Sequence, residues 1–154
     1  MKKKTVFAFT AVLCLCLFSY TGRMAGAAFV EADEDEQESK HPIEIEIEKR
    51  IEDSGYSTIG TVEAYEYGAK EWDKLLNKNY QELMKRLSKE EQEALLVSQR
   101  EWIKYRDLEF AFNGKYWAKF EGTMYTPFPY AFQCNFVRDR ALRLGYYLDD
   151  LINR

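Results

Sequence analysis

Apolar side chains recur every three or four residues along two long stretches of the chain, which is the period of an amphipathic helix. The first stretch predicts a helix from about Ser57 or Thr61 to Leu87. Its stripe is Val62, Tyr65, Ala69, Trp72, Leu76, Tyr80, Leu83 and Leu87. The second predicts a helix that opens at Thr126-Pro127, with its stripe at Tyr130, Cys134, Val137, Ala141, Leu144, Leu148 and Leu151.

A further helix is predicted between these two. Ser88 is placed to cap it, and Glu91 three residues later completes a capping box. Its inward positions are expected to be Leu95, Gln99, Trp102, Arg106 and Phe110. We expect it to end near Asn113-Gly114, because glycine commonly terminates helices. Residues 113–126 show no steady period and predict one substantial loop.

The first element is ambiguous. Ile43, Ile45 and Ile47 alternate with glutamates as in a half-buried strand, but Ile47 and Ile51 also fit a helix. Pro42 suits a first helical turn and no second strand is predicted, so we expect a short helix over about 43–53. The predicted fold is all-α: a small antiparallel bundle of three long helices plus this short N-terminal helix.

Residues 1–27 have the pattern of a secretory signal. Three lysines precede an apolar run from Val6 to Tyr20, and Ala25-Gly26-Ala27 resembles a cleavage site. The alternative is a membrane anchor, but the run is shorter than the roughly 20 residues needed to span a bilayer. We therefore expect an exported protein, periplasmic or secreted, with no membrane attachment after cleavage behind Ala27.

Charge changes the picture once the signal is set aside. The first 27 residues hold four basic and no acidic side chains, so their removal takes the formal net charge from −4 to −8. Nucleic acid is then an unexpected partner, and a cationic protein a better one, although many exported proteins are acidic only for solubility. Residues 28–40 carry six acids, from which we expect a disordered leader rather than a calcium loop. The folded domain is expected over 41–154.

The sequence predicts no catalytic, metal or cofactor site. Cys134 is the one cysteine left after cleavage, so no internal disulfide is possible. Its apolar neighbours Phe132, Phe136 and Val137 favour a small core residue over a nucleophile or a dimer-linking thiol. The single histidine, His41, supports neither a catalytic triad nor a metal cluster.

Three clusters of residues carry a resemblance to a known family. They are Ala69-x-x-Trp72-Asp73-x-x-Leu76-Asn77-x-x-Tyr80-x-x-Leu83, then Ser98-Gln99-x-x-Trp102-x-x-Tyr105-Arg106-Asp107, and Arg138-x-Arg140-x-x-x-Leu144. Over about residues 42–151 the pattern resembles the N-terminal domain of the LprI-type lysozyme inhibitors, small exported bacterial helical domains. The family usually ties its first helix to the long one by a disulfide, and the corresponding positions here are Arg50 and Ala64. We therefore expect a looser first helix. Many members are also lipid-anchored, a feature that this signal does not support.

The motif residues are expected to be structural. We predict an Asp73–Arg106 ion pair between two helices, flanked by Asn77 and Gln99. The rival interpretation is a catalytic carboxylate, but an Asp neutralised by an Arg is a poor general acid or base.

The resemblance implies a protein that binds and blocks the active-site cleft of a lysozyme. Lysozymes of animal hosts are cationic and work through two carboxylates, so an inhibitor needs hydrogen-bond donors and apolar surface. The loop 113–126 offers both; its candidate residues are Lys115, Tyr116, Trp117, Lys119 and Tyr125. These side chains are otherwise expected to cover the end of the bundle. The alternative function is a non-inhibitory envelope module that binds another protein, and an enzyme is not expected.

Overall fold

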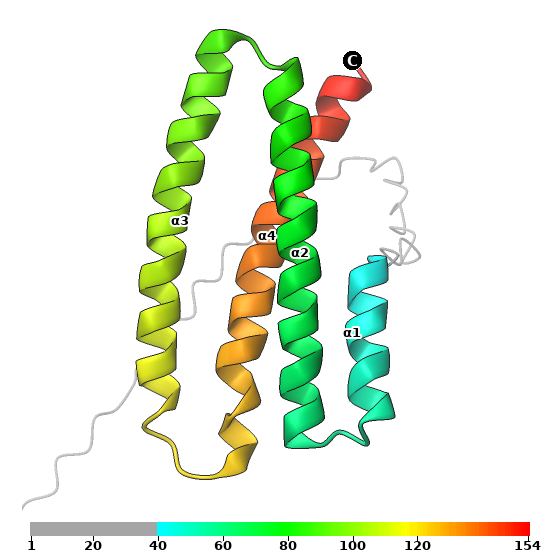
Figure 1. Ribbon diagram of the computed structural model, residues 1–154, viewed down its shortest axis with the longest axis vertical. Coiled ribbons are helices and arrows are strands. Elements are labelled where there is room, and N and C mark those ends of the chain that lie inside the picture. Colours follow the sequence, from blue (N-terminus) through cyan, green and yellow to red (C-terminus); the bar gives the residue numbers. More distant parts are fainter. Residues whose placement is uncertain (1–39) are drawn as a thin grey trace, which may run out of the picture. The chain divides into compact units, whose positions relative to one another are not determined.

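The computed structural model describes residues 40–154, and this range holds helices and no strand. The helices are α1 (Pro42–Asp53), α2 (Thr58–Arg86), α3 (Lys89–Trp117) and α4 (Pro127–Ile152), with a 3-10 turn η1 (Thr123–Tyr125) before α4. Consecutive helices run in opposite directions (Figure 1). The predicted all-α bundle of three long helices and a short one is confirmed. The predicted signal (1–27) and the predicted leader up to residue 39 lie outside the described residues.

Side-chain caps explain where the helices begin. The imidazole Nδ1 of His41 accepts a hydrogen bond from the backbone N–H of Ile43 at 3.2 Å, and the Glu44 carboxylate accepts one from the N–H of His41 at 3.0 Å. This capping box, together with Pro42 in the first turn, makes the alternating Ile-Glu segment a helix. The predicted box at Ser88 and Glu91 is also present.

The core lies between α2 and α4, which make the most extensive helix contact. Nine buried apolar residues form it: Ile47, Ala64, Trp72, Leu76, Leu83, Cys134, Val137, Ala141 and Leu144. Gly68 of α2 permits this close packing. A Cβ there would clash with Ile47 and lie 2.8 Å from the Cys134 sulfur, so only glycine fits between α1 and α4.

Helix α3 packs much less tightly than the others. Its more extensive contact is with α4, and it meets α2 near the connecting turn, where the Gln92 amide donates to the Met84 carbonyl at 2.9 Å. Its one buried residue is the polar Gln99. Leu108 and Phe112 on its outer face are 71% and 65% exposed. The predicted end at Asn113-Gly114 is wrong, since the helix continues to Trp117. The reason lies in tertiary contacts: the rings of Tyr116 and Trp117 pack on Phe120 and Phe128 and hold the last turn in place.

Candidate functional site

Five aromatic side chains gather around the connection from α3 to α4. Figure 1 shows this connection at the lower left. Trp117 stacks on Phe128 with ring centroids 4.5 Å apart, and on Tyr125 at 6.2 Å. Phe120 lies 5.2 Å from Tyr125 and 5.4 Å from Tyr116. We call Tyr116, Trp117, Phe120, Tyr125 and Phe128 the aromatic end. Together these rings form one continuous apolar cluster.

The aromatic end is partly open to solvent and weakly basic. Phe120, Phe128 and Tyr116 each keep more than 40% of their surface exposed, and neighbouring Met124 is 68% exposed. Lys115 and Lys119 are exposed beside the rings, with the Lys119 ammonium 5.9 Å from the Tyr116 ring centre. Glu121 is the one acid between residues 115 and 128. This surface can offer ammonium donors and flat apolar faces to one partner.

A hollow of about 270 Å³ lies within this region, lined in part by Trp117, Phe120 and Tyr125. Gly122 also lines it and has φ of 107°, a left-handed conformation that favours glycine and turns the chain back towards α4. Of the candidate loop residues, Tyr116, Trp117 and Tyr125 lie in one cluster, and the Lys119 ammonium lies beside it. Their local structure differs from the prediction, because Lys115, Tyr116 and Trp117 form the last turn of α3 and Tyr125 belongs to η1.

A polar contact between α3 and α4 involves part of the sequence motif. The Arg140 guanidinium donates hydrogen bonds to the side-chain oxygens of Gln99 at 3.0 Å and Ser98 at 3.3 Å. Trp102, one turn further along α3, stacks on Phe136 of α4 at 5.9 Å. Tyr105 also contacts Phe136, at 5.6 Å, although 54% of its surface is exposed. These residues join the two helices.

The predicted Asp73–Arg106 ion pair is wrong. Arg106 instead pairs with its neighbour Asp107 at 2.7 Å, and Asp73 accepts a hydrogen bond from Asn77 at 2.9 Å within α2. The cause is the packing: α3 contacts α4 rather than the Asp73 face of α2. The partner of Gln99 is thus Arg140, from the third motif cluster. Trp72, another motif residue on α2, is fully buried in the core.

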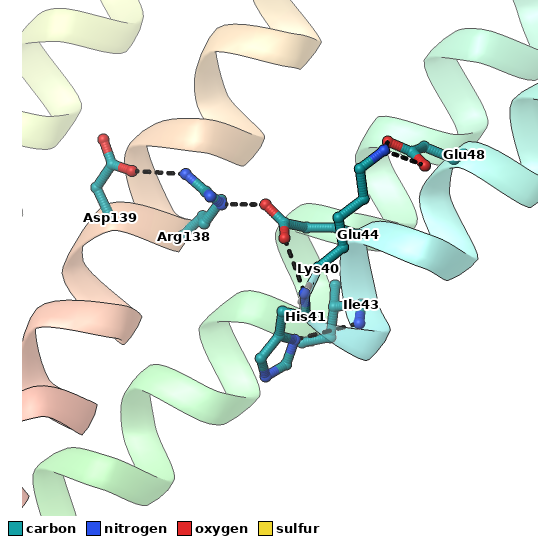
Figure 2. Close-up of polar contacts among 7 residues, drawn as sticks. All are labelled: Lys40, His41, Ile43, Glu44, Glu48, Arg138 and Asp139. Carbon is teal, nitrogen blue, oxygen red and sulfur yellow. Dashed lines mark hydrogen bonds and ion pairs between the residues drawn. The ribbon is translucent and has the colours of Figure 1, made fainter. Parts of the chain in front are cut away.

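Helix α1 contacts both α4 and α2, and Figure 2 shows its ion pair with α4. Glu44 forms an ion pair with Arg138 of α4 at 2.6 Å, and Arg138 also reaches Asp139 at 3.3 Å. Lys40 pairs with Glu48 at 2.7 Å, so contact with α1 begins within the predicted leader. The ring of His41 lies 4.5 Å from that of Trp72. Arg50 stands at one of the two positions of the family's disulfide, and its guanidinium lies 3.8 Å from the centre of the Tyr67 ring.

Reactive groups are scarce among residues 40–154. Cys134 is free and buried, as predicted, and burial raises the pKa of its thiol to about 11. The thiolate that a nucleophile needs is therefore disfavoured. This range contains no cluster of three or more His, Cys, Asp or Glu side chains placed to hold a metal ion. None of its helices is both long and apolar enough to cross a membrane.

Comparison with known proteins adds a family and a fold. The family described as "Lysozyme inhibitor LprI" matches residues 52–144, more than half of the chain. No curated protein matches the chain. A crystal structure of an uncharacterized protein from Burkholderia thailandensis has the same fold, with a TM-score of 0.69 and 23% identity over 74% of this chain. The present chain spans only 57% of that protein's chain.

Proposed function

This chain belongs to the family of the lysozyme inhibitor LprI, and on that premise we propose that it is an exported protein that binds a lysozyme and blocks its active-site cleft. The observation that carries the proposal is the aromatic end, a partly exposed cluster of five rings flanked by Lys115 and Lys119. In this proposal the chain acts as a binding protein and catalyses no reaction.

The chemistry of a lysozyme cleft matches this surface in two respects. Glycoside hydrolysis uses a pair of carboxyl groups beside the scissile bond, and an ammonium group can pair with an ionised carboxylate there. The neighbouring subsites accept sugar rings, whose flat apolar faces can be replaced by aromatic side chains. The Lys119 ammonium lies 5.9 Å from the centre of the Tyr116 ring, so the same part of the surface can present a cation and an aromatic face to the cleft.

Long-range charge favours encounter with a cationic lysozyme but does not select the contact surface. The chain carries a formal net charge of −4, or −8 without residues 1–27, which hold four basic side chains and no acid. Opposite net charges raise the association rate, and the effect weakens as salt screens it. The basic aromatic end would then enter an acidic cleft within an otherwise cationic partner.

The alternative is a module of the same fold that binds another envelope protein and inhibits no lysozyme. The exposed outer face of α3, with Leu108 and Phe112, is the observation that favours it, because exposed apolar surface is typical of protein contacts. Fold alone does not separate the two functions, since function depends on the site.

A turbidity assay separates them. The exported protein is purified after secretion, mass spectrometry establishes its first residue, and a suspension of bacterial cell walls is cleared by lysozyme with and without it. We expect inhibition that deepens as salt is lowered. No inhibition at micromolar excess of the protein in low salt would reject the inhibitor function and favour the interaction module.

Charge reversal tests the contact surface. In the variant Lys115→Glu/Lys119→Glu, each new carboxylate would face the carboxylates of the cleft, so we expect the inhibition constant to rise by about tenfold or more, which corresponds to about 1.4 kcal/mol. Lys78→Glu/Lys89→Glu is a matched control with the same change in net charge, because both are exposed lysines, on α2 and at the start of α3, far along the chain from the aromatic end. Equal inhibition by both variants would place the lysozyme contact elsewhere.

A further inference from the structure

Arg140 and Arg143 of α4 line a second hollow, of about 220 Å³, on the side of the bundle where α3 meets α4. Its other walls are Trp102 of α3 and Phe136 and Asp139 of α4. Arg140, one of the lining residues, also makes the motif contact with Gln99. None of these residues belongs to the aromatic end, so the hollow is a separate feature of the surface.

The two arginines of this hollow lack the carboxylate partners that five of the other six arginines of residues 40–154 have. Arg140 donates only to the neutral oxygens of Gln99 and Ser98. Across residues 40–154, neither Arg140 nor Arg143 forms an ion pair. Five other arginines of this range do: Arg50, Arg86, Arg106, Arg138 and Arg154. The positive charge at the hollow is therefore not neutralised by a direct contact.

Asp139 is the one acid in the wall, and its carboxylate is already engaged. It accepts a hydrogen bond from Arg138 at 3.3 Å (Figure 2), whose guanidinium also binds Glu44. Arg138, Asp139 and Glu44 together carry a formal charge of −1. With Arg140 and Arg143 the local sum is +1, so a positive excess remains at the hollow.

The charged form of Arg140 is disfavoured by its surroundings. Burial, and then repulsion from the nearby charge of Arg143, lower the pKa of the Arg140 guanidinium from its ordinary value, although an arginine stays protonated throughout the physiological range. A bound anion between the two guanidinium groups would relieve this repulsion.

The floor of the hollow is aromatic. Trp102 and Phe136 stack with an interplanar angle of 28°, and the guanidinium carbon of Arg140 lies 5.9 Å from the Trp102 ring centre. Flat apolar surface therefore lies beside the two cations. A ligand that fits must combine a negative group with a flat apolar body.

We propose that this hollow binds a carboxylate attached to a flat apolar group, with Arg140 and Arg143 holding the carboxylate and Trp102 and Phe136 receiving the apolar part. The planar fork of an arginine matches a carboxylate, and the engaged Asp139 at the rim favours a monoanion over a more highly charged phosphate. Pockets for drug-sized ligands are roughly 300–1,000 Å³, so a hollow of about 220 Å³ accepts a small acid or one residue of a peptide.

Titration of the whole protein with benzoate, followed by NMR, tests the site. We expect shifts of the Trp102 indole N–H and of the Arg140 and Arg143 side-chain Nε–H signals. Benzamide, which is neutral with the same shape, and inorganic phosphate should shift them much less. Shifts as large with benzamide as with benzoate would overturn the proposal, because the charge would then contribute nothing. Stronger binding of phosphate than of benzoate would overturn it as well.

Arg143→Gln tests the charge without removing the contact of Arg140 with Gln99, since Arg143 is exposed. We expect benzoate affinity to fall about three- to tenfold. Arg100→Gln is the matched control: Arg100 is an exposed arginine of α3 outside the hollow, so its loss should leave the affinity unchanged. Equal effects of the two substitutions would show attraction by overall charge and reject the site.

The source of the carboxylate is decided by a further comparison with N-acetylphenylalanine, which resembles the C-terminal residue of a peptide. Tighter binding than that of benzoate assigns the site to a peptide C-terminus, and weaker binding assigns it to a small free acid. Either result supports the site. Absence of shifts with both ligands rejects it, and lysozyme inhibition remains a separate question because it depends on the aromatic end.

Discussion

The guanidinium of Arg140 on α4 donates a 3.0 Å hydrogen bond to the side-chain oxygen of Gln99, which is the one buried residue of α3. This contact is a polar link between α3 and α4. It also connects the second and third clusters of the sequence motif. A neutral amide paired with a partly buried guanidinium leaves the charge available while it fixes the position of the side chain.

Gln99→Ala should therefore destabilise the protein by about 1–3 kcal/mol, because Arg140 loses an acceptor and remains partly desolvated. Urea denaturation followed by circular dichroism measures the change. Ser98→Ala is the control, since Ser98 is exposed and its bond to Arg140 is longer, at 3.3 Å. If both variants unfolded at the same urea concentration, the Gln99–Arg140 bond would contribute no more than a surface contact.

Gly68→Ala should destabilise the protein by about 1–3 kcal/mol through overpacking, since the added methyl group would meet Ile47 and Cys134. Gly114→Ala provides the opposite case. It lies within α3, and an added Cβ would meet nothing within 4 Å, so replacement should stabilise by up to about 1 kcal/mol through helix propensity. Thermal unfolding measures the stability of both variants. A higher melting temperature for Gly68→Ala would contradict the close approach of α1 and α4 to Gly68 of α2.

The ion pair between Arg138 and Glu44 predicts how α1 is retained without the family's disulfide. Arg138→Gln should weaken the attachment by about 1 kcal/mol, because both side chains are partly exposed. Amide hydrogen exchange should then accelerate about fivefold in α1 and little in α2. Lys49→Gln, an exposed change on α1 itself, should leave exchange unaltered. Unchanged exchange in Arg138→Gln would mean that α1 is held by apolar contacts alone.

Burial of Cys134 predicts a loss of stability in alkaline solution. Its thiol has a pKa of about 11 in the folded protein against an ordinary value of 9.0, so the unfolded chain releases the proton first. This contribution is fully present below pH 9 and is lost progressively as the pH rises from 9 to 11. Cys134→Ala should show a shallower decline over the same range, as measured by urea denaturation at several pH values. Parallel declines would indicate that the thiol is hydrated in the folded state.

Most of the helical architecture follows from the sequence because its causes are local. The spacing of Trp72, Leu76 and Leu83 specifies an amphipathic helix, and the Ser88–Glu91 box specifies where the next one starts. The cap at His41 is also local, and a Pro at the first helical position was the signal that favoured a helix there. The five rings of the aromatic end also come together for a local reason, because they lie close to one another in the sequence.

Pairing between distant helices depended on the tertiary structure. Periodicity gives the inward face of α3 but not which helix that face meets, and the expected partner of Arg106 was on α2 whereas α3 packs on α4. The same packing places Arg140 beside Gln99 and Trp102, and so creates the hollow with its two unpaired arginines. The sequence by itself determined the helices, their caps and the family motif, because these depend on neighbours a few residues apart. Only the tertiary structure decided the interhelical contacts, because rotation and axial shift of one helix against another depend on the whole core.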